Sequence, residues 1–253
     1  MGKSKIALVT GGSRGIGRDS ALSLARKGID VILTYHVQRE QGEAVVKEME
    51  AMGSKAALLQ LDVAKVSSFD AFVEQLTGVL GDKWGAKQID FLINNAGVSN
   101  HTPISDVTEA EFDNLVDIHF KGVFFLTQKL LPFLADHGAI VNTSTGLTRF
   151  VSPGSALYAS IKGSIEVFTT YLAQELGSRK IRVNVIAPGA INTEFSGDAY
   201  AKNPQLKDMI GSMTALGRIG EASDIGKLTA SLCSDEMGWV TGQCIEASGG
   251  MRL

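Results

Sequence analysis

The sequence predicts an α/β fold: a doubly wound parallel sheet of about seven strands with helices on both faces. Short apolar runs of strand length alternate along the chain with longer segments of helical period. This βαβα order predicts a parallel sheet, because parallel strands need a crossover connection such as a helix between them. The apolar runs are continuous, as expected for strands that are buried on both faces. No repeat or composition shift divides the sequence, so we expect a single domain over residues 1–253.

The first half of the chain contains four of the expected strands. Two of the segments that separate them are longer, and their apolar residues recur with the spacing of an amphipathic helix. We therefore expect strands at Ile6–Val9, Val31–Leu33, Ala57–Leu61 and Phe91–Ile93, with helices from about Gly15 to Lys27 and from about Gln38 to Met52.

The second half continues the same alternation, with one interruption. The helical period weakens between about residues 192 and 214, and we expect a mobile lid or substrate loop there. Helix and strand patterns resume at Asp224 and Gln243. The elements expected before the interruption are helices at roughly Glu109–Leu134 and Ser155–Leu176, and strands at Ala139–Val141 and Ile181–Ile186.

Composition and charge exclude several classes of partner. The 24 basic and 27 acidic residues give a net charge of −3, so no basic surface for nucleic acid is expected. No apolar run approaches the ~18 residues of a membrane span. Cys233 and Cys244 are too few for a disulfide framework and lack metal-ligand spacing. We expect a cytoplasmic protein with no metal site and no membrane or nucleic-acid partner.

The first expected strand ends in a glycine-rich turn. Residues 10–17 read Thr-Gly-Gly-Ser-Arg-Gly-Ile-Gly and open the first helix. A tight bend, close backbone approach and a helix N-terminus are what a strand-to-helix turn needs to bind phosphate. We therefore expect a dinucleotide to contact the loop residues Gly11, Ser13, Arg14, Gly15, Ile16 and Gly17.

Four further motifs follow this loop in order. Asn94-Asn95-Ala96-Gly97 follows the fourth strand, Tyr158-x-x-x-Lys162 lies on a helix, Pro188-Gly189-x-x-x-Thr193 follows the sixth strand, and Ser248-Gly249-Gly250 lies near the C-terminus. With the G-x-x-x-G-x-G spacing of the first loop, the chain resembles the short-chain dehydrogenase/reductase family over essentially its whole length. The resemblance implies a Rossmann-type fold, with adenine bonded by Asp62 beside Val63. It also implies cofactor contacts from Asn95, Ala96, Gly97, Tyr158, Lys162, Pro188, Gly189, Ile191 and Thr193.

Charge at the end of the second strand bears on the choice of cofactor. An acid at this place suits the ribose 2′-hydroxyl of NAD, whereas NADP needs cations for its 2′-phosphate. No carboxylate occurs there before Glu40. Arg14, together with His36 or Arg39, could bind the phosphate, although Arg39 could equally open a solvated helix face. NADP(H) is therefore favoured over NAD(H).

Tyr158 and Lys162 lie one helical turn apart, so they share a face and the cation can act on the phenol. A phenol with an unperturbed pKa of ~10 needs such a cation to exchange protons near neutral pH. The resemblance implies that Tyr158 is the proton donor for reduction and the acceptor for oxidation. It also implies that Lys162 holds the nicotinamide ribose.

Two positions depart from the family pattern. The serine expected thirteen residues before the tyrosine is Thr145, which keeps the hydroxyl that orients a substrate carbonyl; neighbouring Ser144 is the alternative. His119 replaces an asparagine that anchors a water of the proton relay. It could substitute for that residue, or it could be a packed histidine bonded to a backbone carbonyl.

The leading hypothesis is an NADP-dependent carbonyl reductase or alcohol dehydrogenase with a small-molecule substrate. A non-catalytic NADP(H)-binding sensor or scaffold is the alternative. A 3-oxoacyl-carrier-protein reductase is less favoured: Arg179 and Lys180 match one of its basic docking places, but Asp136 occupies the other. Relatives are commonly homo-oligomers, and a tetramer or dimer is expected. Apolar helix positions fit such pairing and fit core packing equally well: Phe112, Val116, Phe124, Leu172 and Leu176.

Overall fold

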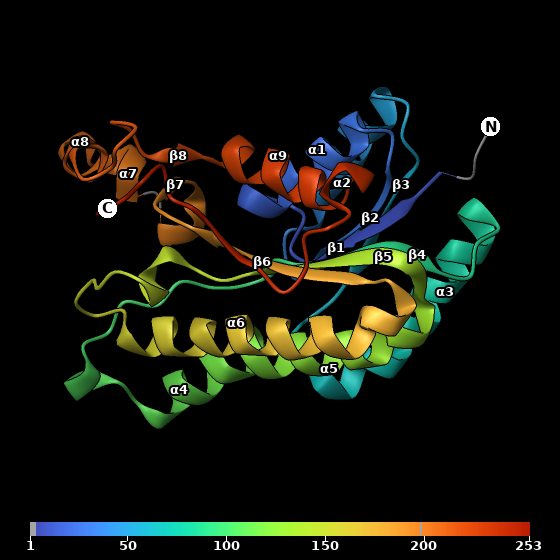
Figure 1. Ribbon diagram of the computed structural model, residues 1–253, viewed down its shortest axis with the longest axis horizontal. Coiled ribbons are helices and arrows are strands. Elements are labelled where there is room, and N and C mark those ends of the chain that lie inside the picture. The colour runs from blue at the N-terminus through green and yellow to red at the C-terminus, as the bar shows by residue number, and fades with distance from the viewer. Residues whose placement is uncertain (1–3, 198) are drawn as a thin grey trace.

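The protein is described by a computed structural model that covers residues 4–197 and 199–253. Seven parallel strands form one sheet in the order β3-β2-β1-β4-β5-β6-β9 (Figure 1). The order reverses between β1 and β4, which confirms the doubly wound α/β class. The strands are β1 Ile6–Val9, β2 Asp30–Tyr35, β3 Ala56–Gln60, β4 Ile89–Asn94, β5 Leu134–Thr143, β6 Arg182–Pro188 and β9 Cys244–Ala247.

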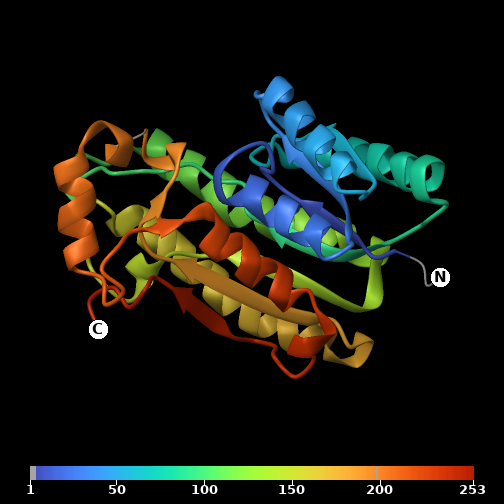
Figure 2. The ribbon, with the colours of Figure 1, turned by 90° about the horizontal axis from the view of Figure 1, so that it is seen from above.

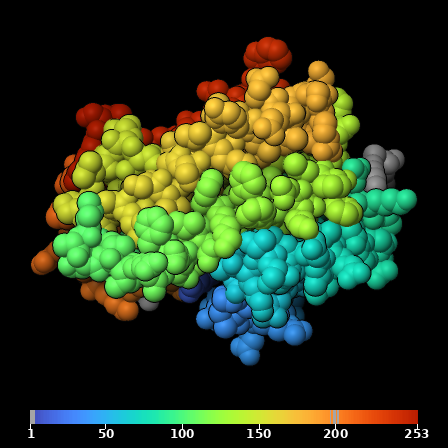
Figure 3. All heavy atoms as spheres, turned by 90° about the horizontal axis from the view of Figure 1, so that it is seen from below, coloured from blue at the N-terminus to red at the C-terminus, as the bar shows by residue number. Residues whose placement is uncertain are grey.

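Helices cover both faces of the sheet, as the sequence predicts. One layer contains α1 (Gly15–Arg26), α2 (Arg39–Ala51) and α9 (Ala222–Leu232), which lie over the strands in Figure 2. The other contains α3 (Phe69–Trp84), α4 (Glu109–Val116), α5 (Gly122–Leu130) and α6 (Ala156–Leu176), whose outer surface is seen in Figure 3. Along β1 the side chains alternate between the two cores: Ala7 and Val9 pack under the first layer, Ile6 and Leu8 under the second.

Helix α3 lies where the sequence analysis assigned no element. Its buried residues Phe69, Phe72, Leu76 and Leu80 recur every three or four positions, so the signal is present in the sequence. Strand β5 begins at Leu134, earlier than expected, because the exposed polar residues Asp136 and His137 interrupt the apolar pattern near its start. The helix expected to continue to Leu134 ends at Leu130 and contains a π-helical turn at Asp117–Lys121.

The segment at about 192–214, where a mobile lid or substrate loop is expected, includes regular secondary structure. It contains α7 (Ala199–Lys202) and α8 (Pro204–Ser212), and it follows β7 (Ile191–Asn192), which pairs with β8 (Gly220–Glu221). Pro204 occupies the first turn of α8, and the Asn203 side chain accepts the Leu206 amide at 3.1 Å. Proline at this position marks the start of a helix rather than a break in one, so the weak helical period of the sequence does not exclude a helix here. Both helices lie at the end of the molecule where the chain terminates (Figure 2).

The apolar helix positions that could serve either core packing or subunit pairing differ in their exposure. Leu172 and Leu176 are buried in the core against the sheet, whereas Phe112 is half exposed on α4. Val167 and Tyr171 add exposed apolar surface on α6. Among the described residues, no helix has the length and apolar character needed to cross a membrane, and no His, Cys, Asp or Glu cluster could hold a metal ion.

Candidate active site

The glycine loop brings backbone to the N-terminus of α1. Gly11 and Gly15 have positive φ angles of 65° and 54°, which glycine adopts at little cost. A Cβ on Gly17 would overlap the Gly11 carbonyl oxygen and the Asn95 side-chain nitrogen. The Arg14 side chain does not cap α1, and the amides of a first helical turn, which point out of the N-terminus, have no partner within the helix. The backbone therefore forms a cradle that suits a pyrophosphate.

The turn after β4 closes the other side of this cradle. The Asn95 side-chain amide donates to the carbonyl oxygens of Thr10 and Gly11 at 3.0 and 3.2 Å. The Thr10 hydroxyl accepts the backbone amides of Asn95 and Ala96 at 3.0 and 3.1 Å. These four bonds hold the first and second predicted motifs together.

The adenine side of the predicted site contains His36 and Asp62. The His36 Nε2 atom lies 3.7 Å from an Asp62 carboxylate oxygen, and both side chains are exposed. The adjacent Val63 carbonyl packs against Gly122 at the start of α5, where a Cβ would overlap it. The turn after β3 is therefore held against the second helix layer.

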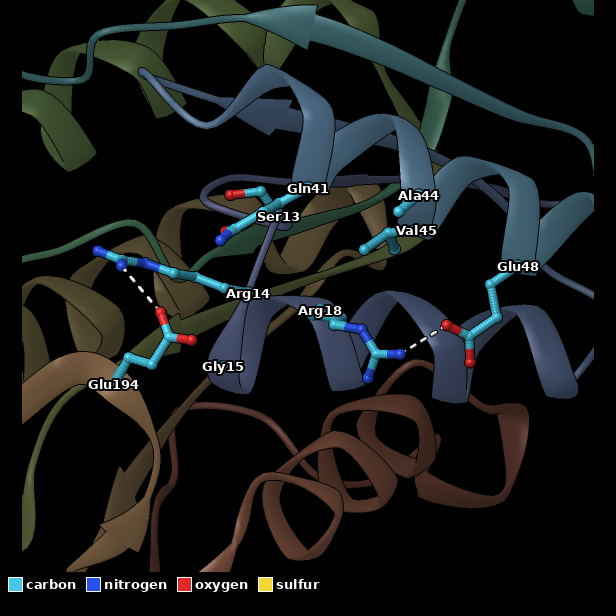
Figure 4. Close-up of a pocket in the computed structure, with 9 residues that line it drawn as sticks. All are labelled: Ser13, Arg14, Gly15, Arg18, Gln41, Ala44, Val45, Glu48 and Glu194. Atoms are coloured by element: carbon cyan, nitrogen blue, oxygen red, sulfur yellow. Dashed lines mark hydrogen bonds and ion pairs between the residues drawn. The ribbon is translucent and has the colours of Figure 1, made fainter. Parts of the chain in front are cut away.

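Two predicted cations occupy different surroundings. Arg14 and Ser13 line a groove between the glycine loop, α1 and α2 (Figure 4). Ile16, from the same loop, does not line this groove and packs against the hydrophobic core. Arg39 lines a separate groove beside β2 and β3 and pairs with Glu43 at 2.8 Å, which raises the pKa of its guanidinium. Of the two alternatives for Arg39, the structure therefore agrees with a solvated position on a helix. Arg39 does not line the groove that contains Arg14.

Tyr158 and Lys162 are both buried on α6. The Lys162 ammonium lies 6.0 Å from the centre of the Tyr158 ring and donates to the Thr143 carbonyl at 2.7 Å. Burial raises the pKa of the Tyr158 phenol and lowers the pKa of the Lys162 ammonium to about 7. This differs from the expectation that the cation lowers the phenol pKa, because desolvation is the larger effect. The phenol is consequently protonated near neutral pH.

The two candidate hydroxyls have different hydrogen-bond partners. The Ser144 hydroxyl lies 2.6 Å from a Glu166 carboxylate oxygen and 3.2 Å from the Lys162 carbonyl, so its single proton is directed into the interior. Thr145 has extended backbone, and its hydroxyl accepts the Leu147 amide at 3.3 Å, which leaves its own proton free. Of the pair, Thr145 retains a donor for a substrate carbonyl.

His119 lies on the π-helical turn and is only 1% exposed. Its ring meets the Tyr158 ring edge-on with 5.2 Å between centroids, and its Nε2 atom lies 2.9 Å from the Val98 carbonyl oxygen. Burial, with a smaller contribution from the Lys162 charge, lowers the pKa of His119 to about 3. The Val98 amide nitrogen lies farther from the same Nε2 atom, at 3.3 Å. The shorter contact, to the carbonyl oxygen, requires a proton on Nε2, and in that tautomer the buried Nδ1 atom is an acceptor with no partner among the described residues. A Cβ on Gly97 would lie 2.6 Å from the same ring.

The turn after β6 completes the site. Its Gly189 amide donates to the Ala247 carbonyl at 3.1 Å, and a Cβ there would lie 2.7 Å from the Ser248 backbone. Pro188 ends β6 and Ile191 begins β7, which directs Thr193 over the glycine loop. There the Thr193 methyl group lies 3.6 Å from the place of a Cβ on Gly15.

Phe195, an apolar residue of the expected substrate loop, lies with its ring centre 6.4 Å from that of Tyr158. Two charged side chains near these motifs were not identified as site residues from the sequence. Glu194 pairs with Arg14, and Glu166 holds Ser144. Their spacing from the motifs is visible in the sequence: Glu194 directly follows Thr193, and Glu166 lies one helical turn after Lys162.

Comparison with known proteins agrees with this arrangement. A family model described as Enoyl-(Acyl carrier protein) reductase matches residues 11–252. The chain belongs to the short-chain dehydrogenase/reductase family. The Rossmann-type sheet, the glycine loop and the paired Tyr158 and Lys162 are therefore features of a family member.

Two curated relatives and one solved structure illustrate its place in the short-chain dehydrogenase/reductase family. An uncharacterised oxidoreductase of Methylorubrum extorquens is 37% identical over 99% of this chain and 98% of its own. The 3-oxoacyl-(acyl-carrier-protein) reductase FabG of Staphylococcus aureus is 36% identical over the full length of both chains. The structure of the angucycline C-6 ketoreductase LanV with bound NADP superposes with a TM-score of 0.93, at 34% identity, over 98% of this chain and 95% of that one.

Proposed function

We propose that this family member is an NADP(H)-dependent carbonyl reductase acting on a free small-molecule ketone or aldehyde. The observation that carries the proposal is the buried Tyr158 phenol on α6, with the Lys162 ammonium 6.0 Å from the centre of its ring. Burial raises the pKa of this phenol, which favours its proton-donor form. A nicotinamide cofactor, when bound, supplies a hydride. Reduction of a carbonyl then needs a proton for its oxygen, and the phenol is in the donor form.

The residues present fit an NADP-type dinucleotide. The cradle formed by Gly11, Gly15 and Gly17 suits a pyrophosphate, and a Cβ at Gly17 would displace the Gly11 and Asn95 atoms that form it. Asp62 would bond the adenine, and Arg14 would bind the 2′-phosphate through its planar guanidinium. The relative LanV, whose structure contains NADP, supports this assignment. Arg39 lines a different groove from Arg14 and is left out of this assignment.

Proton delivery in this proposal uses the chain's own side chains. The Thr145 hydroxyl orients the carbonyl oxygen toward the Tyr158 phenol, which gives up its proton as the oxygen gains charge. The Lys162 ammonium stabilises the resulting phenolate. His119 offers its Nδ1 atom as the acceptor for a water that replenishes the proton, in place of an asparagine.

A carrier-protein substrate is less favoured despite the similarity to FabG. The Arg179 guanidinium donates to Asp136 at 2.8 Å and to the backbone carbonyls of Leu131 and Leu134. A cation held in this way is not available to an acidic carrier protein. We expect a 3-oxoacyl thioester on a carrier protein to be reduced no faster than the same group on a small thiol.

A screen of carbonyl compounds with NADPH and NADH tests the proposal. Tyr158→Phe should lower kcat at least ~10²-fold, the usual scale for a general acid. The control is Tyr171→Phe, which removes the same hydroxyl from another tyrosine of the same helix, keeps the ring, and should leave kcat unchanged. Tight NADPH binding with no turnover of any carbonyl would instead favour a sensor or scaffold.

We further propose a homo-oligomer that buries the exposed apolar residues of α4 and α6, among them Phe112, Val167 and Tyr171. Helices α4 and α6 form part of the outer surface of the second helix layer (Figure 3). Sedimentation equilibrium of the wild-type chain and of Tyr171→Glu tests this. A monomeric wild type would contradict it.

A further inference from the structure

Two ion pairs lie in the groove between the glycine loop, α1 and α2 (Figure 4). At one end the Arg14 Nη1 atom lies 3.1 Å from a Glu194 carboxylate oxygen. At the other end the Arg18 Nη2 atom lies 2.6 Å from a Glu48 carboxylate oxygen. The first pair joins the glycine loop to the residue that directly follows Thr193, whereas the second joins two helices of the same layer.

The Arg14 pair is easily broken. Its side chains are 54% and 55% exposed, and exposed ion pairs contribute little to stability. A phosphate that carries close to two negative charges is a stronger partner for a guanidinium than one carboxylate. Glu194 occupies the Nη1 atom of Arg14, so a ribose 2′-phosphate that bound the guanidinium bidentately through its Nη1–Nη2 edge would have to displace the carboxylate.

We propose that Glu194 is a specificity-determining residue that competes with the 2′-phosphate of NADP(H) for Arg14. The inference rests on the proposed function, which assigns this phosphate to Arg14. NADPH must displace the Glu194 carboxylate, and NADH, which has no 2′-phosphate, leaves the pair intact. Glu194 therefore reduces the preference for NADPH that Arg14 alone would give.

The same competition couples cofactor binding to the segment that carries α7 and α8. Glu194 opens a 3-10 turn immediately before that segment. When phosphate occupies Arg14, the tie between this turn and the glycine loop is lost. Because coupling between two equilibria is reciprocal, NADPH should loosen the turn and loosening of the turn should favour NADPH.

Calorimetric titration of NADPH and NADH into matched variants tests the proposal. Glu194→Gln should tighten NADPH binding about two- to fivefold, the scale of an exposed ion pair, and change NADH binding much less. Glu48→Gln removes the same charge from the same groove without touching Arg14, and it should leave the ratio of the two affinities unchanged. Glu194→Ala should act in the same direction as Glu194→Gln.

The Arg14→Ala background separates the inference from the proposed function. If Arg14→Ala lowers the NADPH affinity selectively but Glu194→Gln does not raise it, the competition is refuted and the phosphate assignment stands. If Arg14→Ala weakens NADPH and NADH equally, the phosphate assignment itself fails. In Arg14→Ala protein, Glu194→Gln should have no further effect on selectivity; a persistent effect would also overturn the competition. Hydrogen exchange of the peptide that carries Glu194 should increase with NADPH and not with NADH.

Discussion

His119 combines a buried acceptor with an edge-on contact to Tyr158, so its ring can be tested atom by atom. His119→Phe keeps a planar ring and removes both nitrogens, and we expect kcat to fall about tenfold or more because the proton route loses its acceptor. His119→Asn restores a side-chain acceptor and should retain most of the wild-type kcat. Steady-state kinetics with NADPH measure both, with the NADPH affinity as the control. Equal activity of the Phe variant and the wild type would show that the histidine only packs.

Lys162 gives a pH dependence of stability whose sign follows from its pKa. Burial lowers that pKa to about 7, against ~10.4 in an unfolded chain. Between these values the unfolded state binds more protons, so the Lys162 contribution makes the free energy of unfolding rise with pH. Lys162→Met removes this contribution and should flatten the rise between about pH 7 and pH 10. Urea unfolding across this range measures the slope; the same slope in wild type and variant would contradict the argument.

At the scale of elements, substitutions of glycine by alanine can show whether helix propensity or the geometry of the glycine loop decides the effect at Gly17. In an ordinary helix interior, glycine to alanine stabilises by about 0.5–1 kcal/mol. A Cβ at Gly17 in α1 would instead overlap the Gly11 and Asn95 atoms of the cradle, so Gly17→Ala should lower both the free energy of unfolding and the affinity for NADPH. Gly78→Ala in α3 meets no atom within 4 Å and should stabilise the protein. Thermal melts and titrations of the two variants give the comparison; stabilisation by both would refute it.

The elements that can be predicted from the sequence are those whose residue pattern is local and does not depend on contacts with distant parts of the chain. The apolar strands β1 and β2 and the glycine loop follow from local periodicity and turn chemistry. The helical course of 199–212 did not, because Pro204 marks a helix end only once its place in the first turn is known. The Glu194 contact with Arg14 spans 180 residues, so no local pattern announces it. The raised pKa of Tyr158 depends on burial by the whole fold.

At the scale of the whole molecule, the C-terminal residues connect parts of the site that are far apart in sequence. Their backbone carbonyls at Gly249 and Gly250 accept the amides of Leu216 and Ala215 at 3.0 and 3.1 Å, just beyond α8. Arg149, which follows the Thr145 turn, donates to the Met251 carbonyl at 2.5 Å. The same guanidinium pairs with Glu246 on β9. The Thr145 turn and the segment after α8 are thus held together through the end of the chain.

Arg149→Ala should therefore loosen the substrate side of the site and leave the cofactor side intact. We expect a higher KM for the carbonyl substrate, an NADPH affinity within about twofold of the wild type, and a lower melting temperature. Arg218→Ala is the matched control, because Arg218 makes a comparable two-bond pair with Asp224, at 2.7 and 3.1 Å, that does not involve the C-terminal residues. Its effect should be confined to melting temperature. Since Arg149 lies outside the glycine loop, a parallel loss of NADPH affinity in Arg149→Ala would mean that the C-terminal residues support the whole fold rather than the substrate side.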